Sequence, residues 1–525
     1  MLPPSTSASG CPSDPRPLVI FGIPGAANSS SALVAALGAS PRSQSSTFVT
    51  CAQPSAALSM ADGYARVSGR PGVCVLADAS VAPNAATALL VEREGESSAL
   101  LVVVQGEERL VAIDGRLHPW PGWGLTGVDG IRDRVRDAQS AELRAHERQL
   151  QAVLGSVRPL LVLGAGARQA LDDPRDPALS AARMRRLMDI VERHALPVVT
   201  SPRAKGIFPE SHAMSLGCHG VNNEWFTRYV RRGISSLLIV GARPARGAAR
   251  GREFGLEPGA PVIHAAAGPA EPDDGAGETT RVLVEPALFL DEFVRCAAQA
   301  HPSRHAAERQ RAFPDSIKRS ERWSGRIERT SLNTPLKPQR VMSELQAILT
   351  HHAGCKGGVN LFCEVGNALG WVSEHLTLET PHRFWCSARA GSAGWACGAV
   401  IGSKLADPER PALAVLGQHA LFAHAEELSE AVKHRVGALW LVLNEETRES
   451  TGGSSRDDVS RLALELGAEV HDVRLPGALV RRFDDALSAA GEHSRPQVLV
   501  VHVDGDEVPA VPHSWRRSPM MRWVS

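Results

Sequence analysis

The sequence predicts an α/β protein of three doubly wound, parallel-sheet domains. Short apolar runs rich in Val, Leu and Ile alternate with helical patterns along most of the chain, and such runs are typical of buried parallel strands. A chain of 525 residues is too long for one hydrophobic core, which favours two to four domains. The strand–helix alternation falls into three successive blocks, so we expect three such domains.

The first block covers residues 17–155 and follows a tail, residues 1–16, that we expect to be disordered. This tail is rich in Pro and Ser and lacks the apolar core of a signal peptide. Strands are expected in LVIFG, GVCVLAD and ALLVVVQG, which are short and apolar. Residues 55–69, SAALSMADGYARVSG, read as a helix that stops at its last glycine.

The central domain is expected at residues 156–300 and the third domain at residues 336–510. Residues 301–335 between them are dense in charge with little periodicity, so we expect an exposed linker. The third block holds six strand candidates, GVNLFCEVG, HRFWCSA, PALAVLG, ALWLVLN, AEVHDV and QVLVVHV. Residues 511–525 form a C-terminal tail, for which docking on a neighbour, covering a pocket and plain solvation stay open.

Charge and cysteine usage exclude several classes of function. Lys plus Arg number 57 and Asp plus Glu number 57, which gives no electrostatic argument for nucleic acid or a membrane surface as partner. No apolar run reaches the length of about 18 residues that a membrane-spanning helix needs. The nine cysteines include no C-x-x-C pair, which favours a reducing cytoplasm. We expect inert buried thiols at Cys51, Cys74, Cys363, Cys386 and Cys397.

One glycine-rich motif and several lone histidines have simple structural explanations. GAGARQ, residues 164–169, follows a strand, but Gln169 stands where a dinucleotide fingerprint has its third glycine. We therefore expect a structural turn there. Single histidines such as His118 and His219 are more often capping, surface or core residues than metal ligands.

Several segments occur together in an order that points to a known family. They are FGIPG, MADGYARVSGRPGV, KGIFPESHAMSLGCHG, GSAGWACGAVIGSKLADPER, and a Gly-led turn followed by EELSEAV and LVLN. From residue 17 to 504 the chain resembles the thiamine-diphosphate (ThDP) enzymes of the benzoylformate decarboxylase and acetohydroxyacid synthase type. These enzymes decarboxylate 2-oxo acids or transfer the resulting acyl carbanion equivalent.

The resemblance implies a specific architecture and assembly. It implies a pyrimidine-binding domain, a central domain and a diphosphate-binding domain, with ThDP and Mg²⁺ as cofactors. It also implies a homodimer or homotetramer, in which a small-molecule pocket lies between the first domain of one subunit and the third domain of its neighbour.

The first departure from the family concerns proton transfer. The family has a glutamate that hydrogen-bonds the aminopyrimidine of ThDP, at the position that holds Pro54 here. Proline has no group that can relay a proton. Gln53 is adjacent, but an amide does not replace a carboxylate on a cationic ring.

Two further departures fall at backbone and apolar contacts to the cofactor. Asn84 is retained, but residues 79–81 (Ala-Ser-Val) replace a Gly-Pro-Gly type of turn, so side chains fill space that glycine leaves open. Gly391 keeps a family position. Ala393 replaces the Met, Leu or Ile that props ThDP in its bent shape.

The diphosphate loop departs as well. Gly417, Gln418 and His419 replace the family's Gly-Asp-Gly, and Ala420 follows. In the family the second glycine lets backbone amides meet the diphosphate, whereas here that position carries the imidazole of His419.

The family's metal ligands correspond to Gln418, Glu445 and the backbone carbonyl of Thr447. Asp and Asn are usual at the first two positions, so the ligand charge is moved from one residue to the other. The Ser/Gly-rich stretch after Thr447 is shorter than the family's active-site segment.

Three hypotheses follow from these departures. The leading one is a homologue that does not bind ThDP–Mg²⁺ in the usual way and is repurposed, either to ThDP-independent catalysis or to a binding or scaffold role. Candidate catalytic residues in the old pocket are then Gln53, His419 and Glu445. The alternative is a divergent ThDP- and Mg²⁺-dependent lyase or carboligase. A third is a new transition-metal site made by His419, His424 and Glu445.

Overall fold

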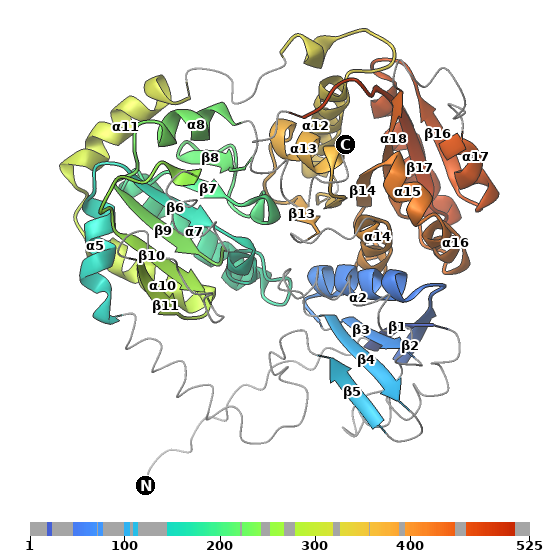
Figure 1. Ribbon diagram of the computed structural model, residues 1–525, viewed down its shortest axis with the longest axis horizontal. Helices are drawn as coiled ribbons and strands as arrows, with labels where there is room; N and C mark the ends of the chain where they lie inside the picture. Colours follow the sequence, from blue (N-terminus) through green and yellow to red (C-terminus); the bar gives the residue numbers. More distant parts are fainter. Residues whose placement is uncertain are drawn as a thin grey trace.

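The computed structural model describes three α/β units, each built on its own sheet (Figure 1). The described residues are 18–23, 46–70, 72–76, 99–105, 109–113, 144–220, 223–242, 253–266, 279–318, 326–355, 357–387, 394–446 and 458–509. Three sheet-based units confirm the predicted fold class. Within the described ranges, no helix is both long and apolar enough to cross a bilayer.

The first sheet has the strand order β2-β1-β3-β4-β5. Its strands are β1 (Leu18–Gly22), β2 (Ser46–Thr50), β3 (Gly72–Leu76), β4 (Ala99–Gln105) and β5 (Arg109–Ile113). All neighbours pair in parallel except β5, which runs antiparallel to β4. Helix α2 (Pro54–Ser68) ends where Gly69 adopts a left-handed φ of 68°, as the glycine stop predicts.

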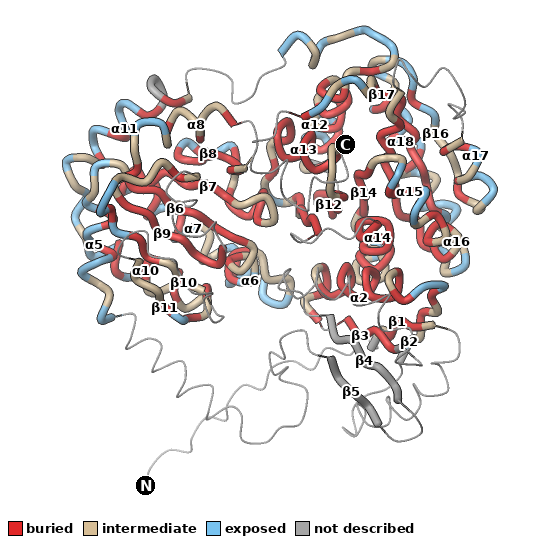
Figure 2. Tube along the Cα trace, viewed as in Figure 1, coloured by how far each residue is buried: buried red, intermediate tan, exposed pale blue. Residues whose placement is uncertain are grey.

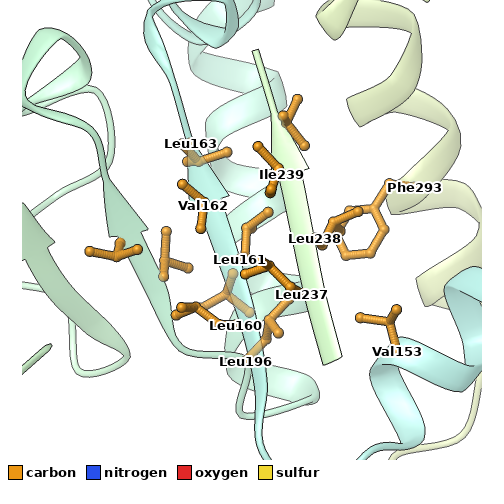
Figure 3. Packing of buried hydrophobic residues seen from close by; sticks show 14 of the residues in the cluster. Val153, Leu160, Leu161, Val162, Leu163, Leu196, Leu237, Leu238, Ile239 and Phe293 are labelled. Atoms are coloured by element: carbon orange, nitrogen blue, oxygen red, sulfur yellow. The ribbon is translucent and has the colours of Figure 1, made fainter. Parts of the chain in front are cut away.

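The central sheet has the order β11-β10-β9-β6-β7-β8. Its strands are β6 (Pro159–Leu163), β7 (Val198–Thr200), β8 (Ser215–Cys218), β9 (Ser236–Val240), β10 (Val262–Ala266) and β11 (Thr279–Leu283). The helical elements are α5 (Glu147–Gly155), η2 (Ala165–Ala167), α6 (Arg168–Leu171), α7 (Pro177–Arg193), η3 (Pro202–Ala204), α8 (Glu224–Val230) and α10 (Pro286–Gln299). Leu160 to Leu163 on β6 and Leu237 to Ile239 on the adjacent strand β9 belong to the packed hydrophobic core of this unit (Figure 3).

The segment expected to be an exposed linker contains a helix, so that prediction is wrong over much of its length. Helix α11 (Arg304–Ser316) starts at the cap residue Ser303. Its Ala306 and Phe313 are buried in the core of the central unit. The buried Arg309 donates hydrogen bonds to backbone carbonyls, among them that of Ala195 at 2.8 Å. A short turn, η4 (Glu328–Thr330), follows.

The third sheet has the order β13-β12-β14-β15-β17-β16. Its strands are β12 (Asn360–Cys363), β13 (Arg383–Cys386), β14 (Ala412–Gly417), β15 (Leu439–Glu446), β16 (Glu469–Val473) and β17 (Gln497–Asp504). All pair in parallel, and each coincides with a predicted run. The helices are α12 (Pro338–Cys355), α13 (Asn367–His375), α14 (Trp395–Ala406), α15 (Gln418–Ala423), α16 (Glu426–Lys433), α17 (Asp458–Glu465) and α18 (Ala478–His493).

The first and third units meet through α2 and α14, which are buried along most of their length (Figure 2). A Cβ atom at Gly63 would lie 2.0 Å from the carbonyl oxygen of Ala399, and one at Gly402 would lie 1.9 Å from that of Met60. Only glycine permits so close an approach of two backbones. Trp395 also donates a 2.7 Å hydrogen bond to Asp62 across this contact.

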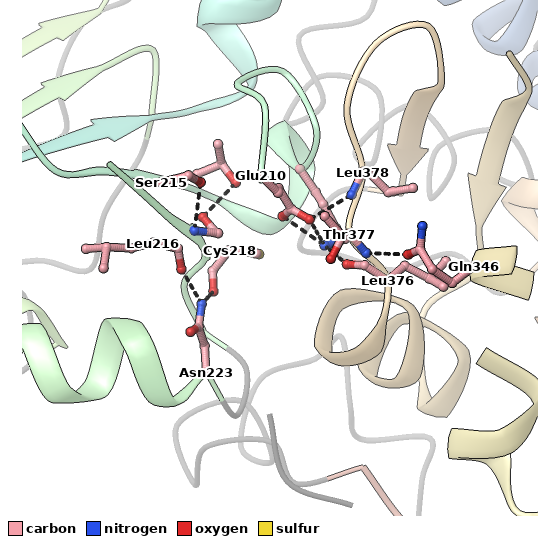
Figure 4. Close-up of polar contacts among 12 residues, drawn as sticks. Glu210, Ser215, Leu216, Cys218, Asn223, Gln346, Leu376, Thr377 and Leu378 are labelled. Atoms are coloured by element: carbon pink, nitrogen blue, oxygen red, sulfur yellow. Dashed lines mark hydrogen bonds and ion pairs between the residues drawn. The ribbon is translucent and has the colours of Figure 1, made fainter. Parts of the chain in front are cut away.

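The central and third units meet at the KGIFPE segment. Glu210 accepts a hydrogen bond from the backbone N–H of Leu378 at 2.8 Å. Figure 4 shows Glu210 facing the 376–378 loop of the third unit, where Gln346 in turn accepts a bond from the N–H of Thr377. The recognisable motifs ADGYAR and KGIFPE therefore both serve contacts between units.

Candidate functional site

The candidate site lies at the carboxyl ends of the strands in the third sheet. Parallel α/β sheets place ligand sites at this edge. Strand β12 leads into Glu364 and Asn367, β14 into Gln418, and β15 ends with Glu445 and Glu446. Because β12, β14 and β15 are neighbours in the sheet, these segments lie along one edge.

The turn after β14 is continuous with a helix. Helix α15 begins at Gln418, directly after Gly417, whose backbone is extended with a φ of −85°. Among the described residues, a Cβ atom at Gly417 would meet nothing within 4 Å. The side chain of His419 is exposed, Gln418 is half-buried and Ala420 is buried.

Glu445 has a hydrogen-bond partner within the third unit. Its Oε1 accepts a 3.0 Å bond from Nδ2 of Asn367, the first residue of α13. Glu445, which stands at a position expected to bind the metal, is therefore hydrogen-bonded to the neutral side-chain amide of Asn367. The sequence offers a weak signal for Asn367, since it follows a strand of the same sheet.

The predicted metal group of His419, His424 and Glu445 is not assembled. Nδ1 of His424 faces Oε1 of Glu427 at 3.5 Å, while Glu445 is bonded to Asn367. In the part of the chain that the structure describes, no three His, Cys, Asp or Glu side chains are arranged to hold a metal ion.

Glu364 is a buried carboxyl that the sequence did not reveal. It is 1% exposed and accepts hydrogen bonds from the backbone N–H groups of Val365 at 3.1 Å and Ala396 at 2.9 Å. Burial raises the pKa of Glu364 to about 7, although these N–H donors and the charge of His424 act in the opposite direction.

Glu427 is a second buried carboxyl close to the same histidine. It is 2% exposed, and its Oε2 has no hydrogen-bond partner in the structure. Burial raises the pKa of Glu427 to about 7, and the hydrogen bond with His424 opposes that rise. The same hydrogen bond raises the pKa of His424.

The imidazole of His424 lies directly against Gly394. A Cβ atom at Gly394, which has a φ of +89°, would fall 1.9 Å from Cδ2 of His424. The buried Glu364 and Glu427 and the half-buried His424 thus form an acid–histidine–acid group beside the start of α14. Groups with pKa values near the ambient pH are suited to giving and taking protons.

The first unit carries no carboxylate at the predicted glutamate position. Pro54 is the buried first residue of α2, and the first turn of that helix contains no acidic residue. Gln53 precedes it, is exposed, and makes no side-chain cap to the helix.

Several predicted site residues fall outside the described residues. They are Asn84, Gly391, Ala393 and Thr447, together with residues 79–81 and the Ser/Gly-rich stretch that follows Thr447.

The GAGARQ motif has a packing role. A Cβ atom at Gly164 would lie 2.2 Å from Cα of Ala242, and one at Gly241 would lie 2.5 Å from the backbone nitrogen of Ala167. The glycines let this turn pack against the end of β9, in agreement with a structural turn.

Comparison with protein families gives three successive matches along the chain. Residues 19–118 match "Thiamine pyrophosphate enzyme, N-terminal TPP binding domain", residues 147–293 match the central domain of the same enzymes, and residues 364–501 match their C-terminal TPP binding domain. Thiamine pyrophosphate is another name for ThDP.

Curated relatives are similar at low identity. A probable acetolactate synthase large subunit of Methanococcus aeolicus is 21% identical over 453 residues, which cover 75% of this chain and 73% of the relative. A putative thiamine pyrophosphate-containing protein of Bacillus subtilis is 24% identical over 369 residues, 68% of this chain and 59% of the relative. A putative acetolactate synthase large subunit of Mycobacterium tuberculosis is 25% identical over 399 residues, 70% of this chain and 68% of the relative.

Proposed function

The chain belongs to the thiamine pyrophosphate enzyme family. Within this family, we propose that the chain no longer binds ThDP and Mg²⁺ in the usual way. Its ancestry is that of the ThDP-dependent 2-oxo acid decarboxylases and acetolactate synthases. Its present role is ThDP-independent catalysis in the old pocket, or the binding of a small molecule there.

The observation that carries this proposal is the geometry around His419. The imidazole occupies the second position of α15, immediately after the Gly417 turn. The family needs a bare backbone there to bring amides to a diphosphate. Gln418 beside it offers only a neutral oxygen, whereas Mg²⁺ is usually bound through carboxylates and phosphates.

Two further features of the chain argue against binding of ThDP and Mg²⁺ in the family's manner. Glu445 is hydrogen-bonded to Asn367, so metal binding would have to compete with that bond. Pro54 leaves the first unit without the carboxylate that the aminopyrimidine needs. Since the family's pocket takes its first and third domains from different subunits, both halves of a symmetric site carry these changes.

Glu364, His424 and Glu427 support a role that does not need ThDP. The two carboxyl groups have pKa values raised to about 7 by burial, and the histidine lies beside Glu427. These groups are able to hold and move protons near neutral pH without a cofactor-derived base.

Calorimetric titration of the purified protein with ThDP, with and without Mg²⁺, tests the proposal. We expect no Mg²⁺-dependent heat of binding in the sub-millimolar range. Tight, Mg²⁺-dependent binding would overturn it. An intact-complex mass measurement of native protein identifies any other small molecule that co-purifies.

The second candidate is a divergent ThDP- and Mg²⁺-dependent lyase or carboligase. The matches to two TPP binding domains favour it. In that case Gln418, Glu445 and the Thr447 carbonyl hold the metal, and Glu445→Ala abolishes turnover of a 2-oxo acid. Unchanged turnover in Glu445→Ala rejects this candidate.

We also propose a homodimer or homotetramer in a reducing compartment such as the cytoplasm. The family's pocket needs two subunits. Seven cysteines in the described part of the chain are buried thiols, namely Cys51, Cys74, Cys218, Cys296, Cys363, Cys386 and Cys397.

A further inference from the structure

We propose a buried binding site for a small oxyanion, of the carboxylate or phosphate class, where the first, central and third units meet beside β13. This site is distinct from the loops after β14 and β15. The inference does not depend on whether ThDP binds.

A column of stacked rings and guanidinium groups crosses this junction. Phe362 and Trp385 stack with ring centroids 5.1 Å apart, and Phe362 also meets Trp395 at 5.7 Å. The guanidinium carbon of Arg66, from the first unit, lies 5.3 Å from the centroid of Trp395. That of Arg168, from the central unit, lies 5.5 Å from the centroid of Trp385. The column therefore holds a cation from each of two units against the third.

Among the described residues of this junction, guanidinium groups outnumber carboxylates. Arg168 and Arg383 share one carboxylate, since both lie 3.1 Å from Asp172. Arg66 is paired with Asp62 at 2.9 Å, and that carboxylate also accepts a bond from the neutral indole of Trp395. Three guanidinium groups thus face two carboxylates.

A fourth guanidinium, that of Arg203 in η3, acts on the same region. Burial raises the pKa of Cys386 to about 11, and the positive charges of Arg203, Arg66 and Arg168 oppose the rise. The charge of Arg66 also lowers the pKa of Arg168, after burial itself. The cations are therefore close enough to one another for mutual repulsion. The charge of Glu364, a third acidic group, acts on the pKa of Cys386 in the other direction.

Three hydrogen-bond donors at the junction are buried and have no acceptor within the part of the chain that the structure describes. They are Nη2 of Arg66, Nε1 of Trp385 and Oγ of Ser387. Trp385 is 2% exposed and Ser387 is fully buried. Trp385 lies in β13, and Ser387 is the first residue after that strand ends at Cys386. Phe362, the register partner of Trp385, contacts both that ring and Trp395, and Trp395 in turn contacts Arg66.

These observations together indicate an anionic ligand. Buried donors are almost always satisfied by a protein group, a water or a ligand. A neutral acceptor would satisfy the donors but leave the excess of positive charge. A carboxylate or phosphate does both, since its oxygens accept several bonds at once and pair with guanidinium groups.

The test is a calorimetric titration of the full-length protein with inorganic phosphate and, separately, with acetate. Ionic strength is kept constant with chloride. We expect saturable binding of one anion per chain. The anion that binds with the higher affinity, phosphate or acetate, identifies the class of the ligand. Ser387→Ala and Trp385→Phe each remove one donor, and each should weaken binding about tenfold, as expected for a hydrogen bond to a charged group.

Ser373→Ala is the matched control. Ser373 is also fully buried, and its hydroxyl has no partner among the described residues, but it lies in α13 and takes part in none of the ring and guanidinium contacts above. Its removal should leave anion affinity unchanged. Absence of saturable binding for both anions would overturn the proposal, as would equal affinity in wild type and Ser387→Ala. Should Trp385→Phe fail to fold, judged by circular dichroism, Ser387→Ala alone decides.

Discussion

Nζ of Lys205 lies 2.8 Å from Oε2 of Glu210, and both side chains are fully buried. The same ammonium donates to the carbonyl of Leu376 at 2.7 Å, and Glu210 accepts from the N–H of Leu378. The two charges of the KGIFPE segment thus form a polar contact that joins the central unit to the third unit. Lys205 and Glu210 neutralise each other's charge, and this pairing, not a catalytic role, explains why both are found in a buried interface.

Lys205→Met should destabilise the protein strongly. It leaves the carboxylate of Glu210 buried without its cation, a change that costs about 3–5 kcal/mol in comparable pairs. Urea denaturation followed by fluorescence measures the loss. Arg482→Ala, which breaks only the exposed pair with Asp485, is the control and should cost about 0–1 kcal/mol. Equal stability of Lys205→Met and wild type would show that the pair is not needed.

Much of the fold could be predicted because the inner strands are buried on both faces. Strands such as β6 and β14 read as unbroken apolar runs, and both are almost completely buried. The apolar runs do not predict four edge strands, β2, β5, β8 and β11, although they do predict the edge strands β13 and β16 of the third sheet. Edge strands need less apolar surface. Helix α11 escaped prediction because its few buried residues stand among many charges.

Gly63→Ala should force α2 and α14 apart. The added methyl carbon would lie 2.0 Å from a backbone oxygen of Ala399, which cannot yield as a side chain does. We expect a loss of at least about 1–3 kcal/mol, measured by urea denaturation. Gly491→Ala in α18 is the matched control, since a Cβ atom there meets nothing within 4 Å. It should be neutral or gain about 0.5–1 kcal/mol. Similar effects of the two variants would contradict the close helix contact.

The site was less predictable than the fold. Glu427 stands in EELSEAV, where a glutamate reads as part of a solvated helix face, and only the packing of α16 under α14 buries it. Asn367 lies far from Glu445 in sequence, so their hydrogen bond can be predicted only when the order of the strands in the sheet is known. The substitutions at Pro54 and His419 could be recognised from the sequence alone, because each replaces a residue of a family motif.

Glu427→Gln should change how stability depends on pH. The pKa of Glu427 is raised from an ordinary value near 4.5 to about 7, chiefly by burial. Below pH 4.5 the carboxyl is protonated in both folded and unfolded chains. As the pH rises further, the unfolded chain loses this proton first, so stability falls until the pH passes about 7. The total effect is about 3 kcal/mol at 1.36 kcal/mol per pKa unit.

A neutral amide has no such titration, so Glu427→Gln should show a flatter stability profile between pH 5 and pH 8. Thermal unfolding across this range measures it. His424, Glu364 and Glu426 are the charged groups that act on Glu427. Glu465→Gln, an exposed glutamate at the end of α17 that is not among the groups acting on Glu427, is the control and should keep the slope of wild type. A slope unaltered by Glu427→Gln would mean that this carboxyl is not held protonated by the fold.

Restoring the family's diphosphate loop should restore cofactor affinity in part. The double variant Gln418→Asp with His419→Gly supplies a charged oxygen for Mg²⁺ and opens the backbone of α15 to a diphosphate. We expect Mg²⁺-dependent ThDP binding at least about tenfold tighter than in wild type, a difference of about 1.4 kcal/mol. Titration calorimetry measures it. His419→Ala is the control, because it removes the imidazole without adding the ligand charge, and it should give a smaller gain. If the double variant binds no better than wild type, then Gln418 and His419 are not what keeps ThDP out. The exclusion would then have to come from Pro54 or from the bond between Asn367 and Glu445.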